Sequence, residues 1–186
     1  MIKSILQPDE RIALFIDGFS VYSIAKSLVF DIDFGKLLKL FTDEEFNTRV
    51  LRANYFVSMY DTSTTEENIL KPMVDWLAFN GYRVVSKTRR DFLDKQGNKR
   101  SKTNVNVEMV VDMFDQSEFV DHIVIFSGDG DLRYAIESLQ RRGKRITVVS
   151  SKQTETAAVS DDLRKQADNF IEIADLKSQI ERKRKQ

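Results

Sequence analysis

Three aspartates lie directly after short apolar runs, and their types and spacing suit metal-assisted chemistry. Asp17 ends the run at residues 11–17, and Asp129 and Asp131 follow the run at residues 122–126. If both runs are central strands of a parallel sheet, their carboxyl ends share one edge and the three carboxylates converge there. Like charges this close need a proton or a cation between them. An all-oxygen ligand set suits Mg²⁺ or Mn²⁺, ions that activate water and neutralise developing charge in phosphate chemistry.

The same aspartates have a structural alternative. A carboxylate after a strand often caps the helix that follows, so Asp131 could cap a helix beginning at Leu132, and Asp17 could satisfy a turn. Either residue taken alone is equally well explained in this way. Because acids follow two different strands, and each lies beside a glycine that permits a sharp turn, the metal site is the favoured interpretation.

The segment at residues 104–116 adds further polar candidates. Its pattern predicts a helix that is apolar on almost every side and therefore buried. Since a helix that follows a strand begins at the carboxyl edge of the sheet, we expect Asn106 near the aspartates. Asp112 lies ~9 Å farther along the axis and about 240° around it, on one face with Glu108. For Asp112, a catalytic role and a structural ion pair both stay open.

Strands and helices alternate along the chain in an order that would position these residues. Strands are predicted at residues 11–17, 49–60, 82–86, 122–126, 145–149 and 170–173. Helices are predicted at residues 21–28, 34–41, 66–80, 104–116, 132–142 and 156–166. This alternation indicates an α/β fold with a mostly parallel, doubly wound sheet. We expect one domain at residues 1–175, followed by a charged helix or tail at residues 176–186.

The composition excludes several kinds of site. The 186 residues include no cysteine and one histidine, which excludes disulfides, thiolate metal sites, cysteine nucleophiles and multi-histidine sites. We interpret that histidine, His122, as structural. Lys+Arg and Asp+Glu are both 29, so the overall charge does not indicate nucleic-acid binding. Because the N-terminus has no apolar signal region and no run is long enough to span a membrane, we expect a cytoplasmic protein without a membrane partner.

One local segment is strongly basic. Residues 87–103 form a polar excursion in which Gln96-Gly-Asn98 predicts the turn of a hairpin or mobile loop. The excursion leads into the helix that carries Asn106, so it could track a phosphate backbone. The alternative is a solvated hairpin without a ligand. The candidate substrate-binding residues in this segment are Arg89, Arg90, Arg100 and Lys102.

Four short motifs, in this order, resemble the NYN domain family, the LabA-like group of the PIN-like nuclease superfamily. They are Phe15-Ile-Asp-Gly-Phe-Ser-Val-Tyr22, Lys102-Thr-Asn-Val-Asn-Val-Glu-Met-Val-Val-Asp112, Ser127-Gly-Asp-Gly-Asp-Leu132 and Arg142-Gly-Lys-Arg145. The resemblance implies a three-layer α/β/α PIN-like fold, a Mg²⁺ or Mn²⁺ site and cleavage of RNA. It implies that Asp17, Asp129 and Asp131 are family acids of the metal site, and that Asp112 is the acid that closes the middle motif.

The chain departs from the family pattern at two positions. Ser20, a candidate substrate-binding residue, stands where the first motif usually has Asn, and Asn106 stands where the middle motif usually has Asp. Because Asn offers an oxygen but no charge, this change should weaken binding of a hard cation. An enzyme with a reduced site, an inactive nucleic-acid binder and a deliberate Asp→Asn change all stay open.

A metal-dependent ribonuclease is therefore the favoured function, and RNA is the expected partner. The alternative is a catalytically degenerate RNA-binding or scaffold module with the same fold. A phosphatase of the haloacid dehalogenase type needs a second Asp two residues after the first, where this chain has Phe19. A dinucleotide-binding domain needs a Gly-rich loop after the first strand, which residues 17–20 do not provide. The sequence leaves the oligomeric state open, with a homodimer as one option.

Overall fold

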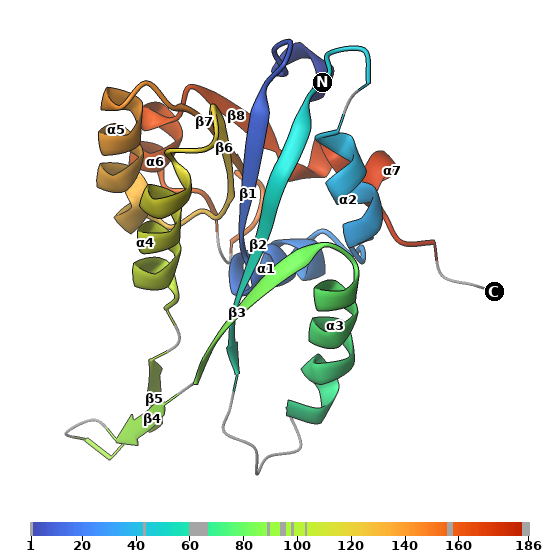
Figure 1. Ribbon diagram of the computed structural model, residues 1–186. Helices are drawn as coiled ribbons and strands as arrows, with labels where there is room; N and C mark the ends of the chain where they lie inside the picture. Colours follow the sequence, from blue (N-terminus) through green and yellow to red (C-terminus); the bar gives the residue numbers. More distant parts are fainter. Residues whose placement is uncertain are drawn as a thin grey trace.

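A six-stranded parallel sheet forms the centre of the computed structural model (Figure 1). The structure describes residues 2–42, 44–59, 67–88, 90–93, 96–97, 99–102, 104–155 and 158–183, with the backbone alone at 67–69, 90–93 and 99–102. The strand order is β3-β2-β1-β6-β7-β8, and every neighbouring pair is parallel. The strands are β1 (Arg11–Asp17), β2 (Arg49–Met59), β3 (Tyr82–Thr88), β6 (His122–Phe126), β7 (Arg145–Ser150) and β8 (Asn169–Glu172). The predicted parallel α/β sheet is confirmed.

Helices cover both faces of this sheet. They are α1 (Gly18–Ser27), α2 (Phe34–Leu40), α3 (Glu67–Phe79), α4 (Asn106–Gln116), α5 (Arg133–Arg141), α6 (Asp161–Gln166) and α7 (Lys177–Ile180), with short 3-10 turns at Ile2–Ser4, Gly130–Leu132 and Ile173–Leu176. One hydrophobic core joins α1, α2, α3 and α7 to one face of the sheet, and a second core joins α4, α5 and α6 to the other. The result is the three-layer α/β/α arrangement visible in Figure 1.

The central strand β1 shows why its sequence is apolar throughout. Ile12, Leu14 and Ile16 pack into one core, while Ala13 and Phe15 pack into the other. All five side chains are fully buried. A strand covered on both faces needs apolar residues at consecutive positions, which is the pattern that predicted it.

The order of the strands places a switch point between β1 and β6. From β1 the chain proceeds through β2 to β3 at one edge, then returns to β6 on the other side of β1 and continues to β7 and β8. Crossovers that diverge in this way leave a crevice outside the carboxyl ends of the two central strands. Ile16 pairs with Phe126 near those ends, so the residues that follow β1 and β6 begin side by side.

The basic excursion forms an antiparallel hairpin of β4 (Arg90–Leu93) and β5 (Lys99–Lys102), as predicted. Gly97 lies in its turn with a φ of 79°, a conformation that glycine adopts without strain. In Figure 1 the hairpin projects from the body between β3 and α4. The predicted substrate contacts of Arg90, Arg100 and Lys102 concern side chains outside the described part of the chain, and Arg89 lies outside it altogether.

Two predicted helices differ from the observed ones. The helix predicted at residues 156–166 begins at Asp161, because the preceding segment bonds to neighbouring loops: Val159 N–H donates to the Ser151 carbonyl and Ser160 N–H to the Gly128 carbonyl. The helix α4 is not buried on every side, since Val107 and Val111 are 70% and 53% exposed. One sheet face covers only one side of a helix, and here the methionines of α4 occupy that side.

The C-terminal segment is packed onto the sheet's helical layer rather than frayed. Ile180 of α7 is buried in the same core as α2. Beyond it, Glu181 forms a bridge with Ile32, and Arg182 N–H donates to the Asp31 carbonyl at 2.8 Å. The predicted boundary after residue 175 is therefore followed by a short helix that contacts the domain.

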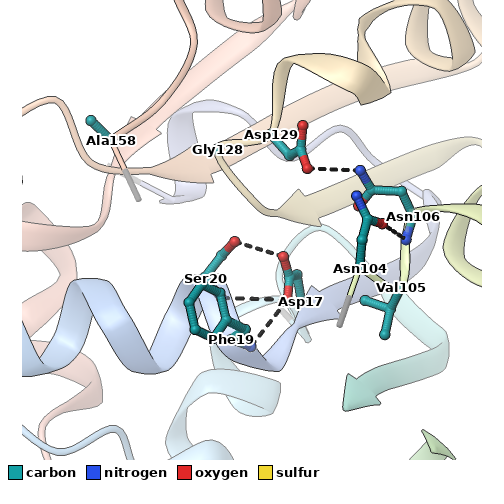
Figure 2. A pocket seen from close by; sticks show the side chains of 9 residues that line it. All are labelled: Asp17, Phe19, Ser20, Asn104, Val105, Asn106, Gly128, Asp129 and Ala158. Atoms are coloured by element: carbon teal, nitrogen blue, oxygen red, sulfur yellow. Dashed lines mark hydrogen bonds between the residues drawn. The ribbon is translucent and has the colours of Figure 1, made fainter. Parts of the chain in front are cut away.

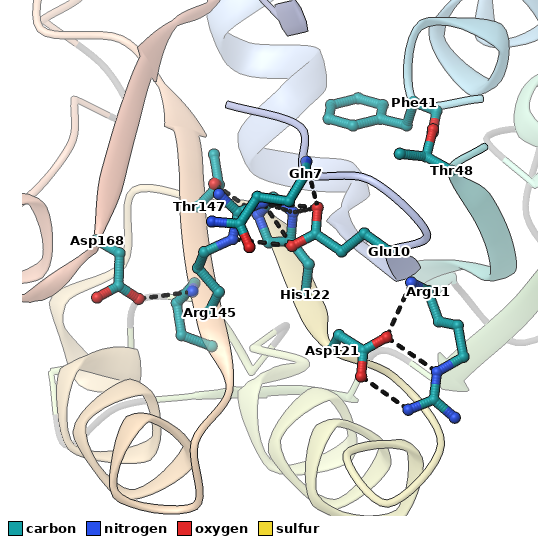
Figure 3. A network of polar contacts seen from close by, with 11 residues as sticks. Gln7, Glu10, Arg11, Phe41, Thr48, Asp121, His122, Arg145, Thr147 and Asp168 are labelled. Atoms are coloured by element: carbon teal, nitrogen blue, oxygen red, sulfur yellow. Dashed lines mark hydrogen bonds and ion pairs between the residues drawn. The ribbon is translucent and has the colours of Figure 1, made fainter. Parts of the chain in front are cut away.

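A buried polar network lies where β1, β6 and β7 begin, at the end of the strands opposite the switch-point crevice. Figure 3 shows its side chains. His122 has Nδ1 3.2 Å from Glu10 Oε2 and Nε2 2.7 Å from Thr147 Oγ1. Arg145 Nη2 donates to Glu10 Oε1 at 2.5 Å. Burial opposes ionisation of Glu10, but hydrogen bonds and charge from His122 and Arg145 hold its pKa below the ordinary value. His122 thus joins the starts of three strands, which agrees with a structural role.

Candidate functional site

A cleft of about 300 Å³ opens where β1 and β6 end (Figure 2). Its walls come from the β1–α1 junction, the start of α4, the loop after β6 and the loop before α6. The lining residues are Asp17, Phe19, Ser20, Asn104, Val105, Asn106, Gly128, Asp129 and Ala158. The cleft therefore occupies the switch-point crevice and contains two of the three predicted carboxylates.

Asp17 is fixed in this cleft by the helix that it caps. Its Oδ1 accepts from the backbone N–H groups of Phe19 and Ser20 at 3.0 and 3.4 Å, and its Oδ2 accepts from Ser20 Oγ at 2.6 Å. Asp17 thus has a structural role, as the N-cap of α1 rather than in a turn, and this role does not exclude a second one. These bonds hold the carboxylate in one orientation at the carboxyl end of β1.

Gly18 allows this close fit. A Cβ atom at this position would lie 2.7 Å from Tyr55 Oη and 2.9 Å from the Phe56 carbonyl oxygen. Any larger residue would push α1 away from β2 and displace Asp17. Tyr55 is itself buried, and its burial together with the charge of Asp17 raises the pKa of its hydroxyl.

Asp129 is held from the other side of the cleft. Its Oδ1 accepts from Asp131 N–H at 2.9 Å, and its Oδ2 accepts from Asn106 Nδ2 at 2.7 Å. Asn106 is oriented in turn, because its backbone N–H donates to Asn104 Oδ1 at 2.6 Å. The expected position of Asn106, beside the aspartates at the start of α4, is the observed one.

The electrostatics of the cleft favour a cation. Asp17 is only 8% exposed, and burial raises its pKa despite the hydrogen bonds from Ser20 and Phe19, with a further contribution from the charge of Asp129. Among the described residues, no lysine or arginine contacts either carboxylate. A buried carboxylate without a countercharge takes up a proton or a cation.

Asp131 is not brought to the other two. It is exposed and lies outside the cleft lining. The cap predicted for Asp131 belongs to Asp129 instead, because Asp131 N–H donates to Asp129 Oδ1 where the chain turns into the 3-10 segment Gly130–Leu132. Within the described ranges, no group of three acidic or histidine side chains is arranged to hold a metal ion. The expected convergence of three carboxylates is therefore a meeting of two, with an amide in a third place.

Asp112 also lies away from the cleft. Its Oδ2 accepts from Arg83 Nη1 at 2.5 Å, and both residues line a separate cleft between β3 and α4. Glu108, on the same helix face, pairs with Lys87 at 2.8 Å; burial opposes its ionisation, but the lysine holds its pKa below the ordinary value. The structure thus favours the ion-pair alternative for Asp112.

Four residues that line the cleft were not predicted in the places or roles that the structure shows. Ser20, expected to bind substrate, uses its hydroxyl to orient Asp17. Phe19, Asn104 and Ala158 were not singled out. The Asn-x-Asn spacing before a helix could have indicated Asn104 as a cap, whereas Ala158 reaches the cleft only because the loop after β7 folds back over it.

Comparison with known proteins agrees with this geometry. Residues 11–175 match the NYN domain. The chain belongs to the NYN domain family. A relative in Synechococcus elongatus, Low amplitude and bright protein LabA, is 30% identical over 174 residues, which are 92% of this chain and 88% of that protein. The family relation makes this NYN domain a member of the PIN-like nuclease domains.

A solved structure shows the same fold. The crystal structure of a protein of unknown function from Vibrio parahaemolyticus has a TM-score of 0.67 and 23% identity, covering 89% of this chain and 95% of that one.

The described part of this NYN domain contains no helix of the length and apolar character needed to cross a membrane.

The donor set at the cleft fits a hard divalent cation. The lining residues with side-chain oxygens are Asp17 and Asp129, with carboxylates, Ser20, with a hydroxyl, and Asn104 and Asn106, with amides. Mg²⁺ and Mn²⁺ prefer oxygen ligands of this kind, and Mg²⁺ commonly binds through one or two carboxylates plus substrate phosphate and water. Two carboxylates therefore suffice for such an ion, while the neutral amide makes its site weaker than one with three acids.

Proposed function

We propose that this NYN domain hydrolyses RNA phosphodiester bonds with the help of Mg²⁺ or Mn²⁺. One observation carries the proposal: the carboxylates of Asp17 and Asp129, from the two central strands, face one cleft without a cationic side chain among the described residues. Such an ion, when bound, lowers the pKa of an attacking water and neutralises charge on the phosphoryl oxygens.

The chain's own residues have separate tasks in this proposal. Asp17 and Asp129 hold the ion, and Ser20 keeps Asp17 in the orientation that the cap of α1 defines. Asn106 positions Asp129 through its amide N–H. Asp131 lies outside the cleft lining and has no task at the ion in this arrangement.

The basic hairpin supplies the substrate contacts. Lys102 closes β5 two residues before Asn104 of the cleft lining, so the strand leads directly to the site. We assign phosphate binding to Lys102, and backbone contacts farther from the scissile bond to Arg89, Arg90 and Arg100. Cations in such a segment bind phosphates without regard to base sequence.

The alternative is a degenerate RNA-binding module. Asn106 donates a hydrogen bond to Asp129 where the family usually has a carboxylate, and its amide brings no charge to help hold an ion. That module binds RNA in EDTA and cleaves none at any metal concentration.

One assay separates the two functions. Single-stranded, structured and transfer RNAs are incubated with Mg²⁺, Mn²⁺ or EDTA, using the wild type, Asp129→Asn and a matched control, Asp75→Asn. Asp75 lies on α3 in an exposed pair with Lys71. We expect metal-dependent cleavage that is lost in Asp129→Asn and kept in Asp75→Asn. Absence of cleavage under every condition, with binding retained, would establish the degenerate module instead.

A further inference from the structure

The outer face of α1 carries two aromatic side chains that nothing in the described fold covers. Phe19 and Tyr22 are 66% and 62% exposed. The opposite face of the helix packs into the core through Val21, Ile24 and Ala25. Positions 19 and 22 are three residues apart and therefore neighbours on one side of the helix. Large aromatic side chains are mostly buried in folded proteins, so an adjacent exposed pair indicates a binding surface.

This pair is continuous with the candidate site. Phe19 lines the cleft, and its backbone N–H donates to Asp17 Oδ1 at 3.0 Å (Figure 2). The ring therefore stands at a fixed position relative to one of the two carboxylates. Tyr22 extends the same surface by one helical turn away from the cleft.

A cation completes the row. Lys26 is exposed, and its Nζ lies 5.9 Å from the centre of the Tyr22 ring. Positions 19, 22 and 26 follow the helical repeat, and the row extends for roughly 10 Å along α1 at ~1.5 Å per residue. We call Phe19, Tyr22 and Lys26 the α1 row. Aromatic rings that accept stacked bases, next to a cation that binds phosphate, are the features by which proteins hold single-stranded nucleic acid.

The chemistry of the α1 row discriminates between single-stranded and duplex substrates. Bases inside a duplex already stack on one another and do not present their faces to a protein side chain. Unpaired bases do present them. By contrast, the exposed residues Val107 and Val111 on α4 are aliphatic and offer no ring for stacking.

We propose that the α1 row is the platform on which unpaired bases of the RNA stack beside the cleft. The inference rests on the proposed function. It adds that Phe19 stacks the base next to the scissile phosphate, that Tyr22 stacks the following one, and that Lys26 pairs with a phosphate between or beyond them.

The test measures binding without cleavage. A single-stranded oligoribonucleotide carrying 2-aminopurine, and the same strand annealed to its complement, are titrated in EDTA with the wild type and Phe19→Ala, Phe19→Trp and Tyr22→Ala. The matched control is Tyr134→Ala, because Tyr134 on α5 is 70% exposed and has Arg141 5.8 Å from its ring centre. Thermal unfolding checks that each variant is folded.

We expect Phe19→Ala and Tyr22→Ala each to weaken single-strand binding by roughly 5- to 100-fold, the range for loss of one stacked base. Phe19→Trp should retain wild-type affinity and fluorescence quenching, duplex binding should not change, and Tyr134→Ala should have no effect. Equal losses for Phe19→Ala and Tyr134→Ala, or equal losses on single-stranded and duplex RNA, would overturn the α1 row as a stacking platform.

The outcomes also separate this inference from the proposed function. If the wild type cleaves RNA with metal but Phe19→Ala binds normally in EDTA, the platform is refuted and the nuclease stands. If no metal supports cleavage while the stacking losses appear as expected, the nuclease is refuted and the platform stands.

Discussion

Replacing Asn106 by Asp tests the candidate metal site, because it exchanges one nitrogen atom beside Asp129 for an oxygen. The Nδ2 atom of Asn106 lies 2.7 Å from Asp129 Oδ2, and in Asn106→Asp an oxygen takes its place. The substitution keeps the size of the side chain and its backbone bond to Asn104. It replaces an attractive contact with a repulsive one, and it supplies the third carboxylate that the family usually has.

The stability that Asn106→Asp loses without metal follows from this contact. Loss of a hydrogen bond to a charged group removes roughly 1.5–3 kcal/mol. Two carboxylates about 3 Å apart repel by up to ~5 kcal/mol at an effective dielectric constant of 20, and uptake of a proton relieves much of this. In EDTA we therefore expect Asn106→Asp to lower the free energy of unfolding by about 2–4 kcal/mol, or Tm by about 5–15 °C for a chain of this size.

Metal should reverse that loss. A divalent ion converts the added carboxylate from a repulsive neighbour into a ligand, and a tenfold gain in affinity is worth about 1.4 kcal/mol. Stabilisation by a ligand grows with its concentration relative to Kd. Addition of Mn²⁺ should thus raise Tm of Asn106→Asp well above the rise seen for the wild type, and calorimetry should give a Kd at least about tenfold lower.

Asn80→Asp is the matched control. It makes the same chemical change at an exposed position after α3, outside the cleft lining, where the amide donates to the Trp76 carbonyl. We expect no comparable metal-dependent rise in Tm for this variant. If Asn106→Asp and Asn80→Asp behave alike, or if Asn106→Asp gains neither Mn²⁺ affinity nor cleavage rate, then Asn106 does not belong to a metal site.

Three further predictions concern other carboxylates. In EDTA at neutral pH, Asp17→Asn should raise the urea midpoint, because the raised pKa of Asp17 means that wild-type stability falls as the carboxyl ionises in the native state; a lower midpoint would contradict this. With Mg²⁺ or Mn²⁺ present, the same variant should lose cleavage because it lacks a ligand carboxylate. Asp112→Asn, which breaks the pair with Arg83, should cost about 1 kcal/mol and leave metal-dependent cleavage intact, whereas a large loss of cleavage would restore its catalytic assignment. Glu10→Gln should cost about 2–4 kcal/mol by leaving a buried network without its acid, against about 0.5 kcal/mol or less for Asp75→Asn. Because the pKa of Glu10 is lowered, that cost is fully present above its ordinary pKa of 4.5 and should disappear as the pH falls through the lower pKa of the native state.

The sequence by itself determined most of the strands and helices, and the end of the sheet at which the candidate site lies. Consecutive apolar positions at residues 11–17 and 122–126 indicate strands buried on both faces, since a strand with one face in water would alternate apolar and polar residues. Acids at the ends of two parallel strands must then share one edge of the sheet. Helix geometry also separated Asn106 from Asp112 correctly, because the angle between them depends only on the helical repeat.

Tertiary structure alone decided which polar groups meet. Asp129 and Asp131 would face one side if the chain stayed extended, but it turns into the 3-10 segment Gly130–Leu132 directly after Asp129, and Asp131 is exposed outside the cleft. The exposure of Phe19 depends on what packs against α1, and the partners of His122 come from residues far apart in the chain. Local sequence fixes backbone conformation and periodicity, whereas contacts between distant residues depend on strand order, on loops that fold back and on the side of each helix that the sheet leaves open.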